Sequence, residues 1–228
     1  GYEEIGGTTG YSGTFDGRGF RIIGLNAAEG EANKSKASSG IFSTVSEGGV
    51  VKDLRVYASD FFGNGESAGA IAAVNEGTIT GVTTFGNSVE AKNAGGIAGK
   101  NSGSIFESTA SDSVTANGED SYAGGITGVN SGTIGEEGDY GNAAEINANS
   151  AVRSGTDSAA AIGGVVGKNE TDGEVWLANS LGVTTGANAE STGGIAGTNS
   201  GTMTSLYNES IVTGGSNVGG VAGDNSGT

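Results

Sequence analysis

One acidic segment of the sequence carries residue types that could bind a metal ion. Glu136, Glu137 and Asp139 lie close together, directly after Gly135. Carboxylate and backbone carbonyl oxygens are the ligands that calcium takes in proteins. The segment lacks the ligand spacing of an EF-hand loop, and a solvated acidic loop explains the same residues. Calcium is therefore the one cofactor that the sequence leaves open.

Two aromatic residues are candidates for contact with a sugar or another ligand. Tyr140 lies in the same acidic segment, and Trp176 lies on the strand expected after the turn of residues 169–173. That turn has two more residues than its counterparts elsewhere in the chain. A tryptophan beside a widened turn could stack on a sugar ring, although packing along the edge of a strand is the commoner arrangement.

The composition excludes several classes of catalysis. The sequence has no histidine and no cysteine, so Ser-His-Asp and Cys-His arrangements and histidine zinc sites are impossible. Two carboxylates could still hydrolyse a glycosidic bond, but no spacing among the 26 Asp and Glu residues singles out a pair. The arginines are scattered along the sequence and predict no cleft for an anionic sugar: Arg18, Arg21, Arg55 and Arg153.

A repeated unit must position all of these residues, and residues 95–105 are its clearest copy. Each copy reads Gly, a small residue, Ile or Val, a short run, Asn, then Gly two places on and an aliphatic residue. Further copies cover residues 69–79, 124–134, 163–175, 193–203 and 219–228, and a divergent copy starts at Gly40. The shared asparagines are Asn75, Asn101, Asn130, Asn169, Asn199 and Asn225. Repetition at this period indicates a solenoid.

Each position of the unit has a physical role. The run Gly-small-Ile-small-Gly predicts a short strand with one bulky side chain in a tightly wound interior, and its glycines let the backbone turn without a Cβ clash. In the turn Asn-Ser-Gly, as at residues 101–103, asparagine tolerates the left-handed region and glycine supplies a positive φ. If the copies stack, the six asparagines fall in register, and we expect their amides to form a hydrogen-bonded ladder.

The spacing of the asparagines sets the size of one turn of the solenoid. Successive positions differ by 26, 29, 39, 30 and 26 residues. A unit of 26 residues accommodates three short strands, which we place in the first complete unit at residues 70–73, 78–85 and 88–91. Such units stack into a parallel β-helix. We expect the excess that begins at Gly135, within residues 135–149, to leave the rod as a loop or an extra turn.

The first part of the chain shows further strand patterns. Residues 14–23 predict a strand, a tight turn at Asp16-Gly17 and a second strand. Farther along, Phe61 and Phe62 are adjacent, so they cannot both face the interior of an extended chain.

Residues 50–57 predict the most regular strand of the sequence. Leu54 and Val56 share one face by the period of two, with Lys52 near the strand's end. The opposite face carries Asp53, Arg55 and Tyr57.

The repeated unit resembles the GLUG motif of bacterial surface and secreted proteins, here written Gly-Gly-Ile/Val-x-Gly-x-Asn-x-Gly-x-Ile. Residues 13–20 resemble the segment that often precedes such arrays, so the resemblance covers roughly residues 13–228. It implies a bacterial surface or secreted protein with an adhesin-like role. Some proteins with this motif are immunoglobulin A-cleaving zinc proteases, whose signature needs two histidines, so that activity does not carry over to this sequence.

The pattern as a whole predicts one continuous domain. We expect an all-β, right-handed parallel β-helix of about seven rungs with roughly three short strands each. Residues 1–39 would form its N-terminal strands and residues 40–228 its repeats. The last copy stops at Thr228, where each earlier copy places its aliphatic residue. We therefore expect the native polypeptide to continue with more rungs or a cap, and with other domains.

The charge narrows the choice of partners. A formal net charge of −16 argues against nucleic acid and against anionic membrane surfaces, and no stretch is long and apolar enough to be inserted in a membrane. We expect a non-catalytic scaffold or stalk, extracellular or on a bacterial cell surface, that displays or binds a ligand such as a host protein or a glycan. The alternative is a carbohydrate-active β-helix enzyme that acts through a carboxylate pair.

Overall fold

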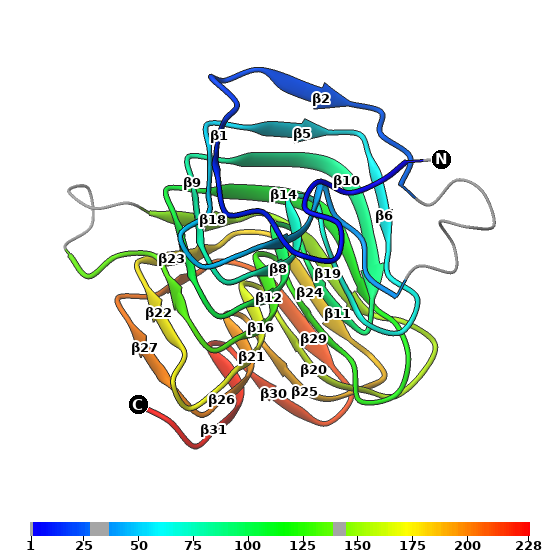
Figure 1. The fold of residues 1–228 in the computed structure, drawn as a ribbon. Coiled ribbons are helices and arrows are strands. Elements are labelled where there is room, and N and C mark those ends of the chain that lie inside the picture. The colour runs from blue at the N-terminus through cyan, green and yellow to red at the C-terminus, as the bar shows by residue number, and fades with distance from the viewer. Residues whose placement is uncertain (1, 28–36, 139–144) are drawn as a thin grey trace.

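The computed structural model describes residues 2–27, 37–138 and 145–228. These residues form an all-β parallel solenoid of about six turns with four parallel sheets and no helix. No helix that could cross a membrane therefore occurs in this part of the chain. Figure 1 looks along the solenoid from its N-terminal end, and the chain runs clockwise as it recedes, so the coil is right-handed as expected.

Every pairing between neighbouring strands is parallel, and we number the sheets by their first strand. Sheet 1 contains β1 (Thr14–Asp16), β4 (Val50–Lys52), β9 (Thr78–Thr80), β13 (Ser104–Phe106), β17 (Thr133–Ile134), β22 (Glu174–Trp176) and β27 (Thr202–Thr204). Sheet 3 contains β3 (Phe42–Val45), β8 (Ala72–Asn75), β12 (Ala98–Asn101), β16 (Thr127–Asn130), β21 (Val166–Asn169), β26 (Ala196–Asn199) and β31 (Ala222–Asn225). Sheet 4 contains β7 (Ser67–Gly69), β11 (Asn93–Gly95), β15 (Tyr122–Gly124), β20 (Ala159–Gly163), β25 (Ala189–Gly193) and β30 (Asn217–Gly219).

Sheet 2 is the widest and has two arms. The first arm contains β2 (Arg21–Ile23), β5 (Arg55–Tyr57), β10 (Thr83–Ala91), β14 (Thr109–Ala116), β18 (Ile146–Ala148), β23 (Ala178–Ser180) and β28 (Tyr207–Asn208). The second arm contains β6 (Asp60–Phe62), the later halves of β10 and β14, β19 (Ala151–Ser154), β24 (Val183–Gly186) and β29 (Ile211–Gly214). In Figure 1 the first arm runs along the top, and the second descends on the right.

Each turn has four strands where the sequence predicts three. The difference arises because a segment predicted as one strand can cross a corner and contribute to two sheets. The strand predicted at residues 50–57 is β4 and β5, which lie in different sheets and are separated at Asp53. Asp53 has a φ of 53°, and every corner between sheets 1 and 2 holds such a left-handed residue. These residues are Arg18, Asp53, Gly81, Glu107, Gly135, Leu177 and Ser205. Only two of them are glycine, so the sequence does not mark the corner.

The N-terminal segment already belongs to the solenoid. β1 and β2 do not pair with each other but with β4 and β5 of the next turn. The turn between them is a corner between two sheets, and its central residues are Arg18 and Gly19 and not the predicted Asp16-Gly17, because Asp16 still belongs to β1. The expected strand, turn and strand are confirmed, and they form part of the first turn.

Aliphatic columns fill the interior. One column lines sheet 1 and another lies at the corner between sheets 4 and 3, and their side chains are fully buried. They are Val51, Ile79, Ile105, Ile134 and Val175, and then Ile71, Ile97, Ile126, Val165 and Ile195. Burial of one such side chain stabilises the fold by about 1.5–3 kcal/mol. Of the adjacent phenylalanines, Phe61 is buried and Phe62 half-buried, as expected.

The repeat glycines are needed for close approach and not for a positive φ. A Cβ on Gly95 would lie 2.0 Å from the carbonyl oxygen of Ala98, and one on Gly103 would lie 2.1 Å from that of Gly77. Neither Gly95 nor Gly103 has a positive φ. The predicted left-handed Asn-Ser-Gly turn is therefore wrong, because the glycines there allow one turn to stack directly on the next.

The predicted asparagine ladder is confirmed along sheet 3. From Asn75 to Asn225, the Nδ2 of each asparagine donates to the Oδ1 of the next one at 2.7–2.8 Å. Each donor also reaches a glycine carbonyl of its own turn, as Asn130 does to Gly132 at 3.0 Å. The first five asparagines are buried and Asn225 is exposed. The ladder starts at Asn75 because Val45 occupies the position before it, and this leaves Asn75 Oδ1 without a partner.

A second polar column, which the sequence did not reveal, lies at the bend of sheet 2. We call it the bend column, and it consists of Ser59, Asn87, Asp112 and Ser150. Ser59 N donates to Asn87 Oδ1 at 2.9 Å, and Asn87 N and Nδ2 both donate to Asp112 Oδ1, at 2.9 and 2.8 Å. Asp112 N in turn donates to Ser150 Oγ at 3.1 Å. The column satisfies backbone groups where a bulge in β10 breaks the ladder of sheet 2.

Asp112 is the buried carboxyl group of the bend column. Burial raises its pKa to about 6, although hydrogen bonds from Thr84 and Asn87 oppose that rise. Its Oδ2 accepts the Thr84 hydroxyl at 2.5 Å. Because folding favours the protonated form, the stability that this proton provides is complete below the unfolded-state pKa and is lost as pH rises through about 6.

We predict that Asn130→Ala destabilises the solenoid while Asn225→Ala leaves its stability almost unchanged. Loss of Asn130 removes the donor to the buried Asn169 Oδ1, and an unsatisfied buried group costs about 1–3 kcal/mol. Asn225 is exposed at the end of the ladder, so its loss should cost less than about 0.5 kcal/mol. Urea unfolding measures both values, and equal midpoints for the two variants would contradict the ladder's role.

We predict that Asp112→Asn removes one component of the pH dependence of stability. The rise of the Asp112 pKa from its ordinary value of 3.8 to about 6 corresponds to roughly 3 kcal/mol, which the wild type loses between about pH 4 and pH 7. The variant keeps an acceptor for Asn87 and has no such loss. Its stability relative to wild type should therefore rise from pH 4 to pH 7.5 in urea titrations, and parallel curves would show that Asp112 does not titrate in this range.

Candidate functional site

The extra residues of the acidic segment fall between two strands in the sequence. Residues 139–144 lie outside the described part of the chain, and residues 146–148, which fall within the range expected for the excess, belong to sheet 2. β17 ends at Ile134 and β18 begins at Ile146, and both keep the register of the preceding turn. Glu136 and Glu137 are exposed, whereas Asp139 and Tyr140 lie outside the described residues. Within the described ranges no three His, Cys, Asp or Glu side chains are grouped to hold a metal ion. Calcium binding by this segment stays a prediction.

Trp176 is held on the outer face of sheet 1. It is half-buried, and its Nε1 donates to Glu174 Oε2 at 3.3 Å. A recess of about 300 Å³ does lie beside the widened turn, but it is lined by Lys168, Glu170, Asp172 and their neighbours and not by Trp176. The Lys168 ammonium there already lies 3.0 Å from Glu170 Oε1. This arrangement favours the structural interpretation of Trp176.

The outer face of the first arm of sheet 2 carries a different constellation. The period of two turns Ile22, Val56 and Thr84 toward the interior, so the residues that flank them face outward. Arg21 then lies beside Arg55 in register, and Ile23, Tyr57 and Phe85 form a row across β2, β5 and β10. We call these five outward residues the arginine–aromatic face: Arg21, Ile23, Arg55, Tyr57 and Phe85.

Tyr57 is the centre of the arginine–aromatic face. The Arg21 guanidinium lies 5.8 Å from its ring centroid, a cation–π arrangement. Phe85 packs edge-on against the other side, with ring centroids 5.9 Å apart. Phe85 and Ile23 are nevertheless 60% and 59% exposed. Clustered exposed apolar side chains of this kind indicate an interaction surface.

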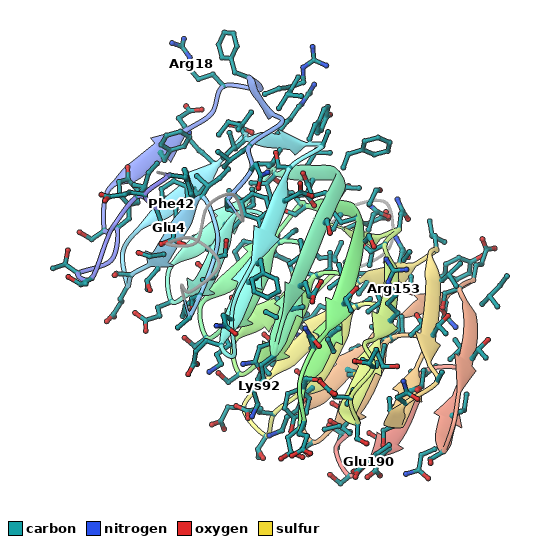
Figure 2. All side chains as sticks on the ribbon, turned by 90° about the vertical axis from the view of Figure 1, so that its right-hand side faces the viewer. Glu4, Arg18, Phe42, Lys92, Arg153 and Glu190 are labelled. Carbon is teal, nitrogen blue, oxygen red and sulfur yellow. The ribbon has the colours of Figure 1, made fainter. Side chains whose placement is uncertain are left out.

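The two arginines of this face have no acidic partner among the residues that the structure describes. Within the described part of the chain, neither Arg21 nor Arg55 forms an ion pair or a side-chain hydrogen bond. Like charges directly opposite one another on neighbouring strands are destabilising. The cluster occurs on a chain with a formal net charge of −16, and Arg18, at the N-terminal end in Figure 2, is also exposed. The face is therefore locally positive on an acidic protein.

Two other places on sheet 2 can be compared with the arginine–aromatic face. Near the C-terminal end, Leu181 and Tyr207 border an open recess of about 390 Å³ with Asn179 and Glu209, so the charged group there is a carboxylate. On the second arm, which faces the viewer in Figure 2, Arg153 donates to Thr115 Oγ1 at 3.1 Å and to Ser113 Oγ. Among the described residues this guanidinium forms side-chain hydrogen bonds, whereas those of Arg21 and Arg55 form none.

The outcome for the sequence-based sites is mixed. Arg55 and Tyr57 do share a face, as predicted. The conclusion that the arginines are scattered is wrong for Arg21 and Arg55, which the register of β2 and β5 brings together. The six ladder asparagines belong to the packing of the solenoid and not to a ligand site.

No protein-family model, curated protein or solved structure matches this chain in the comparisons. The candidate site is therefore assigned from its geometry, and membership of the GLUG repeat family stays a prediction.

Proposed function

We propose that this chain is a non-catalytic, stiff scaffold of a bacterial cell-surface or secreted protein that binds its ligand on the arginine–aromatic face. One observation carries the proposal. Half-buried Tyr57 and exposed Phe85 form an aromatic row, in register with Ile23, beside two arginines that form no ion pair or side-chain hydrogen bond among the described residues. The bacterial and extracellular setting is supported by the resemblance of the repeats to the GLUG motif.

The scaffold role is supported by how the turns are held together. Each turn contacts only its neighbours, as in other solenoids, and the sheets and the asparagine ladder run from turn to turn without interruption. Such a body is elongated and presents its outer face as a regular array. A strongly negative net charge also opposes association of identical rods.

The geometry favours binding over the carbohydrate-active enzyme. A glycosidase needs an acid with a raised pKa in contact with the substrate. Asp112 has such a pKa, of about 6, but it is only 3% exposed and its oxygens accept hydrogen bonds from Thr84 and Asn87. It therefore acts inside the solenoid, out of reach of a polysaccharide.

We predict that the double substitution Tyr57→Ala and Phe85→Ala strongly weakens ligand binding. The chain would be screened against immobilised glycans and extracellular host proteins, and each ligand found would be tested again with the variant. Loss of central aromatic contacts typically costs about 2 kcal/mol or more, which corresponds to at least about a thirtyfold lower affinity.

Tyr207→Ala is the matched control, because Tyr207 is an exposed tyrosine on the same arm of sheet 2. It should leave binding unchanged. A double variant that folds, as judged by its melting temperature, and still binds every ligand like the wild type would exclude this face as the binding site.

A further inference from the structure

We infer that the arginine–aromatic face recognises a carboxylate-bearing polysaccharide, a uronic acid polymer, that lies across the strands of sheet 2 along the solenoid axis. This inference rests on the proposed function and adds the chemical class of the ligand. It follows from the charge, the apolar row and the direction of the two columns.

The charge of the face favours an anionic ligand. Arg21 and Arg55 lie in register on neighbouring strands, about 4.8 Å apart in the direction of the backbone hydrogen bonds. Their mutual repulsion is not offset by an ion pair within the described residues. Guanidinium groups bind carboxylates through paired hydrogen bonds, so a bound carboxylate would remove the repulsion that the free protein retains.

The aromatic row requires a ligand that also has flat apolar surface. Phe85 exposes 60% of its surface and Phe20, just before β2, exposes 75%. The C–H face of a pyranose ring is a flat apolar surface of the size of one aromatic ring, and its hydroxyl groups remain in water. A uronic acid residue combines this face with a carboxylate at its edge.

The two columns are parallel, which fits a polymer. The arginines form one line across β2 and β5, and Ile23, Tyr57 and Phe85 form a second line across β2, β5 and β10. Both lines follow the solenoid axis. An extended polysaccharide placed along this axis could direct its carboxylates to the first line and its ring faces to the second.

Two other occupants fit less well. A peptide that binds a sheet usually gains affinity by pairing its backbone with a free edge. Only β2 has such an edge on this face, and a strand added there would lie beyond Arg21 and Ile23 and away from Phe85 on β10; β5 and β10 are paired on both sides, so they offer only side chains. A second copy of this chain would carry its own net charge of −16 to the interface, and repulsion between the two bodies opposes that contact.

The test uses the full chain and calorimetric titration with polygalacturonate, alginate and hyaluronan, each compared with its carboxyl-reduced counterpart. We expect at least one of the three to bind, with at least tenfold weaker binding after reduction of its carboxylates. The double variant Arg21→Gln and Arg55→Gln should lose at least tenfold in affinity for that polymer, and its remaining binding should depend less on salt.

Arg153→Gln is the matched control, because Arg153 is an outward arginine of the same sheet that already has partners on β14. It should bind like the wild type. Three results would each overturn the inference. They are equal affinity for the charged and the carboxyl-reduced polymers, equal losses of affinity in the control and the double variant, and no binding to any of the three polymers.

The outcomes also separate this inference from the proposed function. If another ligand binds in a manner that depends on Tyr57 and Phe85 while no uronic acid polymer does, only the ligand class is wrong. Sedimentation velocity tests whether a second copy of the chain occupies the face. If the wild type is a dimer and the double variant Arg21→Gln and Arg55→Gln is a monomer, the face binds a second copy and the inference is overturned.

Discussion

Parallel pairing between equivalent residues of successive turns is the constraint on which the rest of this structure depends. Because each strand pairs with its counterpart one turn away, a residue type that recurs in the repeat becomes a column in space. Stacking at the spacing of a β-sheet leaves no room for a Cβ at positions such as Gly95 and Gly103. The glycines of the repeat thus follow from the pairing, and the aliphatic columns follow from the narrow interior that the pairing encloses.

The same constraint has opposite consequences inside and outside the solenoid. An asparagine stacked on an asparagine is self-complementary, because each amide group has both a donor and an acceptor, so the buried ladder satisfies itself. An arginine stacked on an arginine is not self-complementary, because both guanidinium groups are cations that have no hydrogen-bond acceptor. The inner column therefore needs no outside partner, and the outer pair of Arg21 and Arg55 gains from one. This difference is the physical basis for assigning the first column to stability and the second to binding.

The sequence predicts those features that the repeat itself encodes. The parallel solenoid, the ladder from Asn75 to Asn225 and the position of the extra residues after Gly135 all follow from the spacing of the asparagines. The four-stranded turn could not be predicted, because its corners use left-handed residues as varied as Asp53, Glu107 and Leu177. The alternation also slips by one residue at such a corner: Val51 and Leu54, three residues apart, are both buried, so the prediction that Lys52 shares the inner face of Leu54 and Val56 is wrong.

The arginine–aromatic face was missed for a related reason. Arg21 and Arg55 lie in turns that precede the first asparagine of the ladder, where no recurring residue sets the register. Their separation of 34 residues, which is 55 minus 21, matches none of the intervals between the asparagines. The bend column escaped prediction as well, because Ser59, Asn87, Asp112 and Ser150 share a position but not a residue type. In each case the information lies in the pairing of strands and not in the local sequence.

Hydrogen exchange of the asparagine side-chain amides, followed by NMR, tests the in-register stacking most directly. In this account the Nδ2 protons of Asn101, Asn130 and Asn169 are buried and bonded to the next turn, so they should exchange orders of magnitude more slowly than those of the exposed Asn225. Exchange of all four side chains at the rate of a free amide would contradict the stacking, and with it the register that brings Arg21 beside Arg55.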